Sequence, residues 1–136
     1  MIIEHNDHKI IIDPWLLGSC YWRSWWNFPE PSPELIYDLK PDFIYLTHLH
    51  WDHFHGVSLK KLFPKDTKII VPKVQTKRMV DDLNYLGFKD IFEIPHNKKK
   101  ILWDDFSIQT YQFGPGVDSA IMLSGGGYNL FNTNDC

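Results

Sequence analysis

The chain has 136 residues, of which 43% are hydrophobic and 23% charged, and its formal net charge is −3 at pH 7. This composition is typical of an ordinary globular protein of one domain, expected over residues 1–136, and it offers no basic surface for nucleic acid. No apolar run approaches membrane-spanning length, and the amino terminus lacks the form of a signal peptide. Cys20 and Cys136 lie far apart and give no disulfide framework, so we expect a cytoplasmic protein.

The first residues predict two short strands and an acid that needs a partner. Residues 1–4 and Lys9–Asp13 have strand character, and Asn6-Asp7 between them is a turn signal. Positions 10–12 are continuously apolar, so we expect this second strand to be buried on both faces. A carboxylate directly after such a strand needs a partner, although on the sequence alone Asp13 fits a simple Asp-Pro turn equally well.

Residues Trp15–Pro33, here called the aromatic loop, have an unusual composition. They include the large aromatic residues Trp15, Tyr21, Trp22, Trp25, Trp26 and Phe28. Such a loop either forms a wall of a substrate pocket that stacks on a sugar or base, or plugs the sheet with apolar groups. We expect a plug for most of these residues, with one or two tryptophans at the pocket. A helix should begin at Ser32-Pro33-Glu34 and end before Pro41.

A cluster of histidines follows the next strand. The apolar run Phe43–Thr47 predicts a strand, and His48, His50, Asp52 and His53 come directly after it. In α/β sheets the carboxyl ends of the strands are where ligands bind. His48 and His50 can point the same way from an extended loop. Asp52 and His53 can turn toward a second metal position close by. The alternative is a solvated, histidine-rich surface turn.

The remainder of the chain predicts one more strand and helix, and then β-structure. Ile69–Val71 predicts a buried strand, and Val74–Leu86 a helix whose apolar stripe packs on the core. Further strands are expected at Ile91–Ile94, Lys100–Trp103, Phe106–Gln112, Ser119–Leu123 and Tyr128–Phe131, with turns at Gly114-Pro115-Gly116 and at Gly125–Gly127. The basic run Lys98–Lys100 should form a solvated hairpin and His96 a surface residue. This order suggests a mixed sheet with helices on one face.

The stretch His48-Leu49-His50-Trp51-Asp52-His53 has the form His-x-His-x-Asp-His, and it resembles the motif of the metallo-β-lactamase superfamily of metal-dependent hydrolases. The stretches Asp13-Pro14-Trp15-Leu16 and Asn132-Thr133-Asn134-Asp135-Cys136 are similar to flanking motifs of one branch. The combination of motifs is most similar to the metallo-β-lactamase-like domain of the cytidine monophosphate N-acetylneuraminate hydroxylases. The same branch of the superfamily also contains sugar-phosphate lactonases and phospholipase D-type lipases. The resemblance implies an α/β fold, namely the N-terminal half of a four-layer αββα sandwich.

The resemblance also implies a metal centre. Its ligands would be His48, His50, Asp52, His53 and Asp135, which would hold one or two ions, Zn²⁺ first and Mn²⁺ or Fe as alternatives. Asp135 would bridge two ions, and Asp52 would also orient or deprotonate the attacking water. Asp13 would support the ligands from behind. The implied reaction is hydrolysis of a small-molecule ester, lactone or phosphodiester by metal-bound hydroxide.

The chain departs from the family pattern in two places. The loop Phe113–Asp118 lacks the histidine that the family places there, and Asp118 offers only an oxygen ligand in its stead. The family's last histidine follows the bridging aspartate, whereas this chain ends at Cys136. We therefore expect a fragment or a short member, completed by a missing C-terminal half or by self-association.

Two alternatives to a hydrolase stay open. One is the metallo-β-lactamase-like component of an iron-dependent hydroxylase acting on a nucleotide sugar. Neither Cys20 nor Cys136 has a histidine close by, so the chain itself carries no Rieske site. The other alternative is a non-catalytic binding or assembly module.

Overall fold

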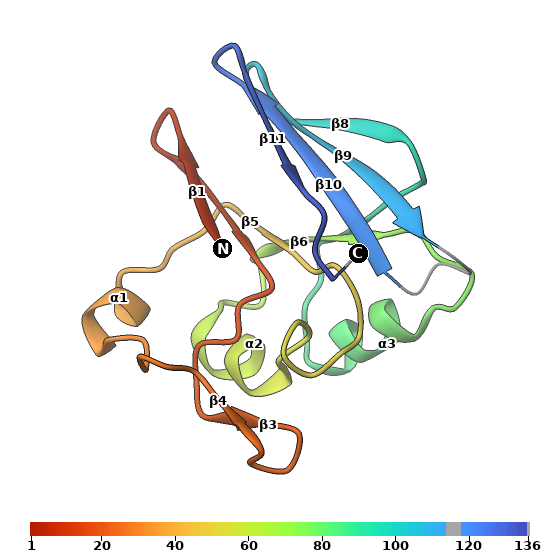
Figure 1. Ribbon diagram of the computed structural model, residues 1–136. Helices are drawn as coiled ribbons and strands as arrows, with labels where there is room; N and C mark the ends of the chain where they lie inside the picture. The colour runs from red at the N-terminus through yellow and green to blue at the C-terminus, as the bar shows by residue number, and fades with distance from the viewer. Residues whose placement is uncertain (114–117, 136) are drawn as a thin grey trace.

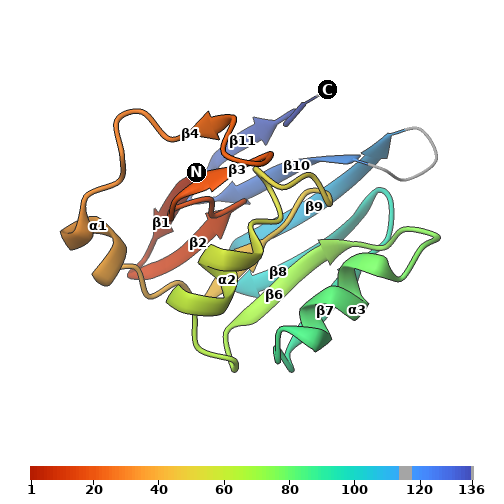
Figure 2. The ribbon, with the colours of Figure 1, turned by 90° about the horizontal axis from the view of Figure 1, so that it is seen from below.

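The strand β5 (Phe43–Tyr45) lies at the centre of the fold, because its side chains point alternately into two hydrophobic cores. Phe43 and Tyr45 pack between two sheets, and Ile44 packs against helices. The computed structural model describes residues 1–113 and 118–135. Figures 1 and 2 show the resulting layers, with helices on one face of the first sheet and the second sheet on its other face. The predicted turn at Gly114-Pro115-Gly116 and Cys136 lie outside the described residues.

The first sheet has five strands in the order β1-β2-β5-β6-β7, of which only β1 is antiparallel to its neighbour. Besides β5, these are β1 (Ile2–His5), β2 (His8–Ile12), β6 (Lys68–Pro72) and β7 (Ile91–Ile94). Asn6 and Asp7 both have positive φ, of 48° and 63°, and form the predicted turn between β1 and β2. The predicted burial of β2 on both faces is confirmed, since Ile10 and Ile11 pack in different cores.

The second sheet is antiparallel, with the order β11-β10-β9-β8. Its strands are β8 (Lys98–Trp103), β9 (Phe106–Phe113), β10 (Asp118–Gly125) and β11 (Tyr128–Asn132). The expected mixed sheet with helices on one face is the first sheet, and the later hairpin strands form a second sheet of their own (Figure 1). These strands have an apolar face of their own, which includes Trp103, Ile108 and Ile121 and packs on the first sheet. The lysine run Lys98–Lys100, expected in a solvated hairpin, lies in β8, which forms a hairpin with β9. Because β8 is an edge strand, its lysines discourage pairing with another chain.

The helices are α1 (Pro33–Tyr37), α2 (Gly56–Leu62) and α3 (Arg78–Tyr85). The predicted start of α1 is confirmed, because the Ser32 hydroxyl accepts a hydrogen bond from the Leu35 amide at 3.2 Å. The last helix begins at Arg78 rather than at Val74. No side chain caps its first turn, and β-branched residues precede it. Its predicted apolar stripe is confirmed, with Met79 and Leu83 buried in the core.

The aromatic loop contains a short hairpin of β3 (Ser19–Cys20) and β4 (Trp25–Trp26), which was expected to be irregular. The expectation that most of its aromatic residues plug the sheet was wrong. Trp22 is 84% exposed and Phe28 99% exposed. The hairpin stands away from the sheet, as Figure 1 shows, so its rings stack on one another and on Trp51 instead.

Candidate metal centre

The parallel strands β2 and β5 end side by side, with Ile12 opposite Tyr45 in the register. Residues Thr47–His53, here called the motif loop, follow β5 at that edge of the sheet. The second sheet reaches the same place, because the Ser119 hydroxyl donates to the Thr47 carbonyl at 3.1 Å. The Tyr45 hydroxyl then donates to Ser119 Oγ at 2.6 Å, so a buried chain of hydrogen bonds fixes the start of the motif loop.

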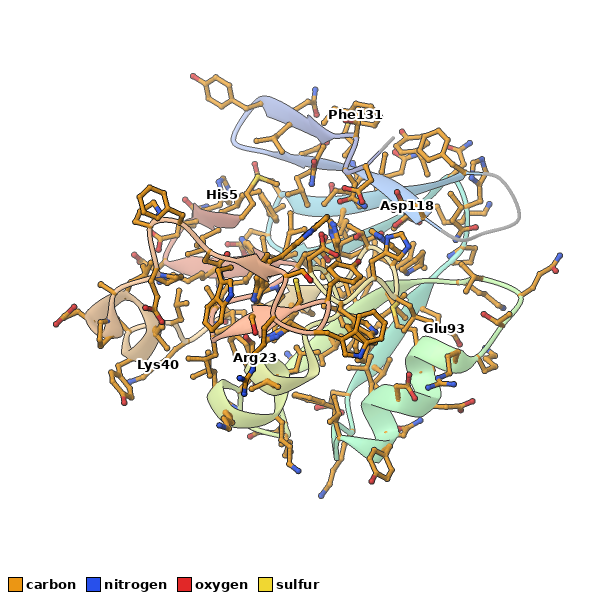
Figure 3. All side chains as sticks on the ribbon, turned by 60° about the horizontal axis from the view of Figure 1, so that its bottom comes forward. His5, Arg23, Lys40, Glu93, Asp118 and Phe131 are labelled. Carbon is orange, nitrogen blue, oxygen red and sulfur yellow. The ribbon has the colours of Figure 1, made fainter. Side chains whose placement is uncertain are left out.

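His48 is buried, and its Nδ1 edge faces groups from both sheets. Nδ1 lies 3.0 Å from Thr47 Oγ1 and 3.3 Å from Asp118 Oδ1, at the beginning of β10 (Figure 3). The Asn134 amide group also approaches Nδ1, at 3.2 Å, but it has a shorter acceptor in Asp118 Oδ1 at 2.6 Å. The tautomer with the proton on Nδ1 satisfies this arrangement and leaves the Nε2 lone pair for a ligand.

The Nε2 atom of His48 faces two further candidate ligands. It lies 2.7 Å from His50 Nδ1 and 3.7 Å from Asp135 Oδ2. Ligand atoms of His48, His50 and Asp135 all lie within 4.8 Å of one another. Burial, and then the neighbouring His53, lower the pKa of His48, so its imidazole stays neutral, as a metal ligand must.

A second group of ligand atoms gathers around His53. Its Nε2 lies 3.4 Å from Asp52 Oδ2 and 3.4 Å from Asp135 Oδ2, while its Nδ1 is hydrogen-bonded to Asp13 Oδ2 at 2.8 Å. Burial acts to lower the pKa of His53, but the hydrogen bond and charge of Asp13, with the charges of the other two carboxylates, raise it. Three carboxylates around one imidazole favour positive charge at this position, which suits a divalent ion.

Asp13 does more than end a strand. Its backbone has a positive φ of 48°, and its amide donates to the Tyr45 carbonyl at 3.0 Å. The carboxylate accepts hydrogen bonds from the Thr47 amide at 2.9 Å, from the Thr47 hydroxyl at 2.7 Å, and from His53. Of the two readings that the sequence left open, the structure therefore supports the one in which Asp13 holds the motif loop.

The aromatic loop contributes Tyr21, which sequence reasoning did not single out. Its hydroxyl donates to Asp52 Oδ1 at 2.8 Å, and its ring stacks on Trp51. Partial burial, and then the hydrogen bond to Asp52, raise the pKa of Tyr21 to about 12, so the hydroxyl stays protonated at neutral pH. The only hint in the sequence is the number of aromatic residues, which does not tell one ring from another.

Two further histidines, His55 and His96, have other roles. His55 caps α2, where its Nδ1 accepts from the Ser58 amide at 3.3 Å. His96 is exposed, as expected, and accepts from the Gln112 amide at 3.1 Å. A pocket of about 750 Å³ opens beside the motif loop and is lined by Leu49 and Trp51 among others, but by none of the five predicted ligands. The candidate centre is therefore a cluster at the sheet edge, and it is not the floor of this pocket.

Sequence comparison finds relatives along the whole chain, although no family model matches it. The chain is 30% identical to the cytidine monophosphate-N-acetylneuraminic acid hydroxylase of Mus musculus and 31% identical to that of Pan troglodytes. It is 29% identical, over 98% of its length, to a protein of Mycolicibacterium smegmatis named as a Rieske 2Fe-2S iron-sulfur protein. The chain spans only about a quarter of the length of these relatives, 25%, 24% and 27% respectively.

Two solved structures share the fold. One is a protein of Parabacteroides distasonis whose name describes a metal-dependent hydrolase, with a TM-score of 0.65 and 16% identity. The other is the metallo-β-lactamase fold protein YhfI of Bacillus subtilis, with a TM-score of 0.56 and 14% identity. Each covers 98% of this chain, which spans 56% and 53% of the two structures. The chain therefore has the metallo-β-lactamase fold, as predicted, and spans about half of each of these two proteins.

In the part that the structure describes, no helix has the length and apolar character needed to cross a membrane.

Proposed function

We propose that this chain of the metallo-β-lactamase fold supplies the ligands of a metal-dependent hydrolase acting on a small-molecule ester, lactone or phosphodiester. His48 and His50 would hold a first ion and Asp52 and His53 a second, with Asp135 shared between them. Zn²⁺ suits imidazole and carboxylate ligands, and Mn²⁺ or Fe suits them as well.

The observation that carries this proposal is the position of one oxygen atom. Asp135 Oδ2 lies 3.7 Å from His48 Nε2 and 3.4 Å from His53 Nε2. Each of these imidazoles has its other nitrogen beside an aspartate, which is how proteins orient metal-binding histidines. Nitrogen lone pairs directed at a shared carboxylate form a donor set that fits two adjacent cations.

A divalent ion bound there would polarise a substrate oxygen and lower the pKa of a coordinated water. The residues of the chain have separate tasks around it. Asp52 would hold the second ion through Oδ2 and orient the attacking water beside it, because Oδ1 is already hydrogen-bonded to Tyr21. Asp13 and Asp118 would keep His53 and His48 in the tautomers that bind metal. The exposed side of Asp135, whose side chain is 52% accessible, leaves room for a small substrate.

The test of this proposal combines metal content with hydrolysis. We expect the purified protein to contain Zn²⁺, Mn²⁺ or Fe and to hydrolyse members of a panel of phosphodiesters, lactones and esters. His48→Ala/His50→Ala should lose the first ion and the activity, whereas the control His96→Ala should keep both, since His96 is exposed and its ring accepts a hydrogen bond from the Gln112 amide. Equal metal content in the double variant and the unaltered protein would refute the assignment.

Similarity along the whole chain supports a second candidate, the metallo-β-lactamase-like component of an iron-dependent hydroxylase acting on a nucleotide sugar. The similarity to a protein named for a Rieske centre points the same way. Iron in the purified protein, with turnover that requires dioxygen and an electron donor, would favour this candidate. Turnover without dioxygen would favour the hydrolase. Metal binding without turnover in either assay would leave a binding or assembly module.

A further inference from the structure

We propose that Tyr21 is a positioning residue for Asp52, and that it belongs to the metal centre although it comes from the aromatic loop. Its hydroxyl would hold one carboxylate oxygen so that the other is presented to the second ion. The proposal rests on the two-ion form of the function proposed above.

The two oxygens of Asp52 have different surroundings. Oδ1 accepts the Tyr21 hydroxyl at 2.8 Å, whereas Oδ2 lies 3.4 Å from His53 Nε2, on the side of Asp135. An ionised carboxylate only accepts hydrogen bonds, so the hydroxyl must be the donor. A donor held at Oδ1 restricts rotation of the carboxylate about its Cβ–Cγ bond. One oxygen is thereby kept on the side of His53 and Asp135 before any ion binds.

The Tyr21 ring is itself held on two sides. It stacks on Trp51 with the centroids 5.6 Å apart and an interplanar angle of 15°. Trp25 meets it edge to face, with the centroids 4.8 Å apart. Trp51 belongs to the motif loop, so the stacking ties the hairpin to the same residues that carry the ligands. Aromatic contacts of this kind fix a ring at little cost in side-chain entropy.

The backbone at this point is strained in a way that serves the contact. Tyr21, Trp22 and Arg23 are consecutive residues with positive φ values of 46°, 55° and 69°. Side chains with a Cβ atom rarely adopt this conformation, and it persists only where the surroundings impose it. The turn brings Tyr21 onto Asp52. Arg23, which is labelled in Figure 3, remains exposed on the hairpin.

The experiment is Tyr21→Phe, which keeps the ring and its stacking but removes the hydroxyl. Metal-free protein is titrated with Co²⁺ or Zn²⁺, and affinity is measured for each equivalent by calorimetry and by the visible absorption of the Co²⁺ form. We expect the first equivalent to bind as in the unaltered protein and the second to bind about 10- to 100-fold more weakly. Tyr85→Phe is the matched control, because Tyr85 is 91% exposed, and it should change neither affinity.

Several outcomes would overturn the proposal, and they differ in what they leave standing. If Tyr21→Phe binds both equivalents as tightly as the unaltered protein, Tyr21 has no positioning role and the proposed function is unaffected. If Asp52→Asn weakens the second equivalent but Tyr21→Phe weakens both equally, the hydroxyl acts on the fold rather than through Asp52. If the unaltered protein takes up only one equivalent, the two-ion form fails together with this proposal.

Discussion

Asp13 offers the sharpest test of how the fold holds its candidate centre. Its carboxylate is the acceptor for three donors: the Thr47 amide, the Thr47 hydroxyl and His53 Nδ1. A typical hydrogen bond contributes about 1 kcal/mol net, and bonds to charged groups contribute more. Asp13→Ala should therefore lower the free energy of unfolding of the metal-free protein by about 3 kcal/mol or more, because Thr47 is buried and its amide is left without an acceptor. Asp13→Asn keeps the shape and one acceptor oxygen, so about 1–2 kcal/mol should be lost.

The assay is urea unfolding followed by tryptophan fluorescence, with the slope of the transition unchanged between variants. Alanine at a positive φ is unfavourable in itself, so the control must carry the same cost. Asp7→Ala provides it, since Asp7 also has a positive φ, of 63°, but lies exposed in the β1–β2 turn. The difference between the two variants then measures the lost hydrogen bonds. A loss for Asp13→Ala no greater than that for Asp7→Ala would refute the reasoning.

Two further predictions concern Asp42, which directly precedes β5, and β11, the edge strand of the second sheet. Partial burial acts to raise the pKa of Asp42, but the hydrogen bond from the Lys9 amide and the contact with His8 outweigh it, so the pKa is lowered. The ionised carboxylate therefore stabilises the fold above about pH 4. This contribution is lost as the pH falls through the lowered pKa. Asp42→Asn should thus be less stable than the unaltered protein at pH 7 and equal to it in strong acid; a difference that does not change with pH in urea unfolding would contradict this. The strand β11 pairs with β10 on one side only and exposes Leu130 and Phe131 at the edge of the second sheet. We therefore expect self-association there, and Leu130→Lys should shift the sedimentation coefficient toward that of the monomer. Identical sedimentation of both proteins as monomers would exclude this edge as a contact.

The strands were predictable because their signals are local. Continuous apolar runs at positions 10–12 and 69–71 indicated strands buried on both faces, and each is buried between two cores. A hairpin turn was expected at Gly125–Gly127, and in the structure Gly126 and Gly127, with φ values of 58° and 78°, form the two-residue turn between β10 and β11. How the strands divide between two sheets could not be predicted, because it depends on which apolar face meets which, and no short stretch encodes that.

The closeness of four of the candidate ligands was predictable from their spacing, but most of the groups that support them were not. His48, His50, Asp52 and His53 fall within six residues, so their proximity follows from the chain itself. Ser119 is 72 residues from the Thr47 carbonyl that it contacts, and Asn134 is 86 residues from His48. Serine and asparagine are common at strand ends and turns for other reasons, so neither stood out. Figure 1 shows how β10 and β11 bring these residues back to the loop after β5.

The two candidate ion positions depend on different layers of the fold. Asp13, which follows a strand of the first sheet, faces the Nδ1 atom of His53, while Asp118, which begins a strand of the second sheet, faces the Nδ1 atom of His48. The Nε2 atoms opposite these contacts both point to Asp135. Each sheet thus orients one histidine, and the shared carboxylate is reached only when the sheets pack correctly on each other. Disturbing the packing between the sheets should therefore separate the two positions. Changing Asp118 alone should weaken mainly the position of His48, whereas changing Asp13 should weaken both, because Asp13 also holds Thr47 beside His48.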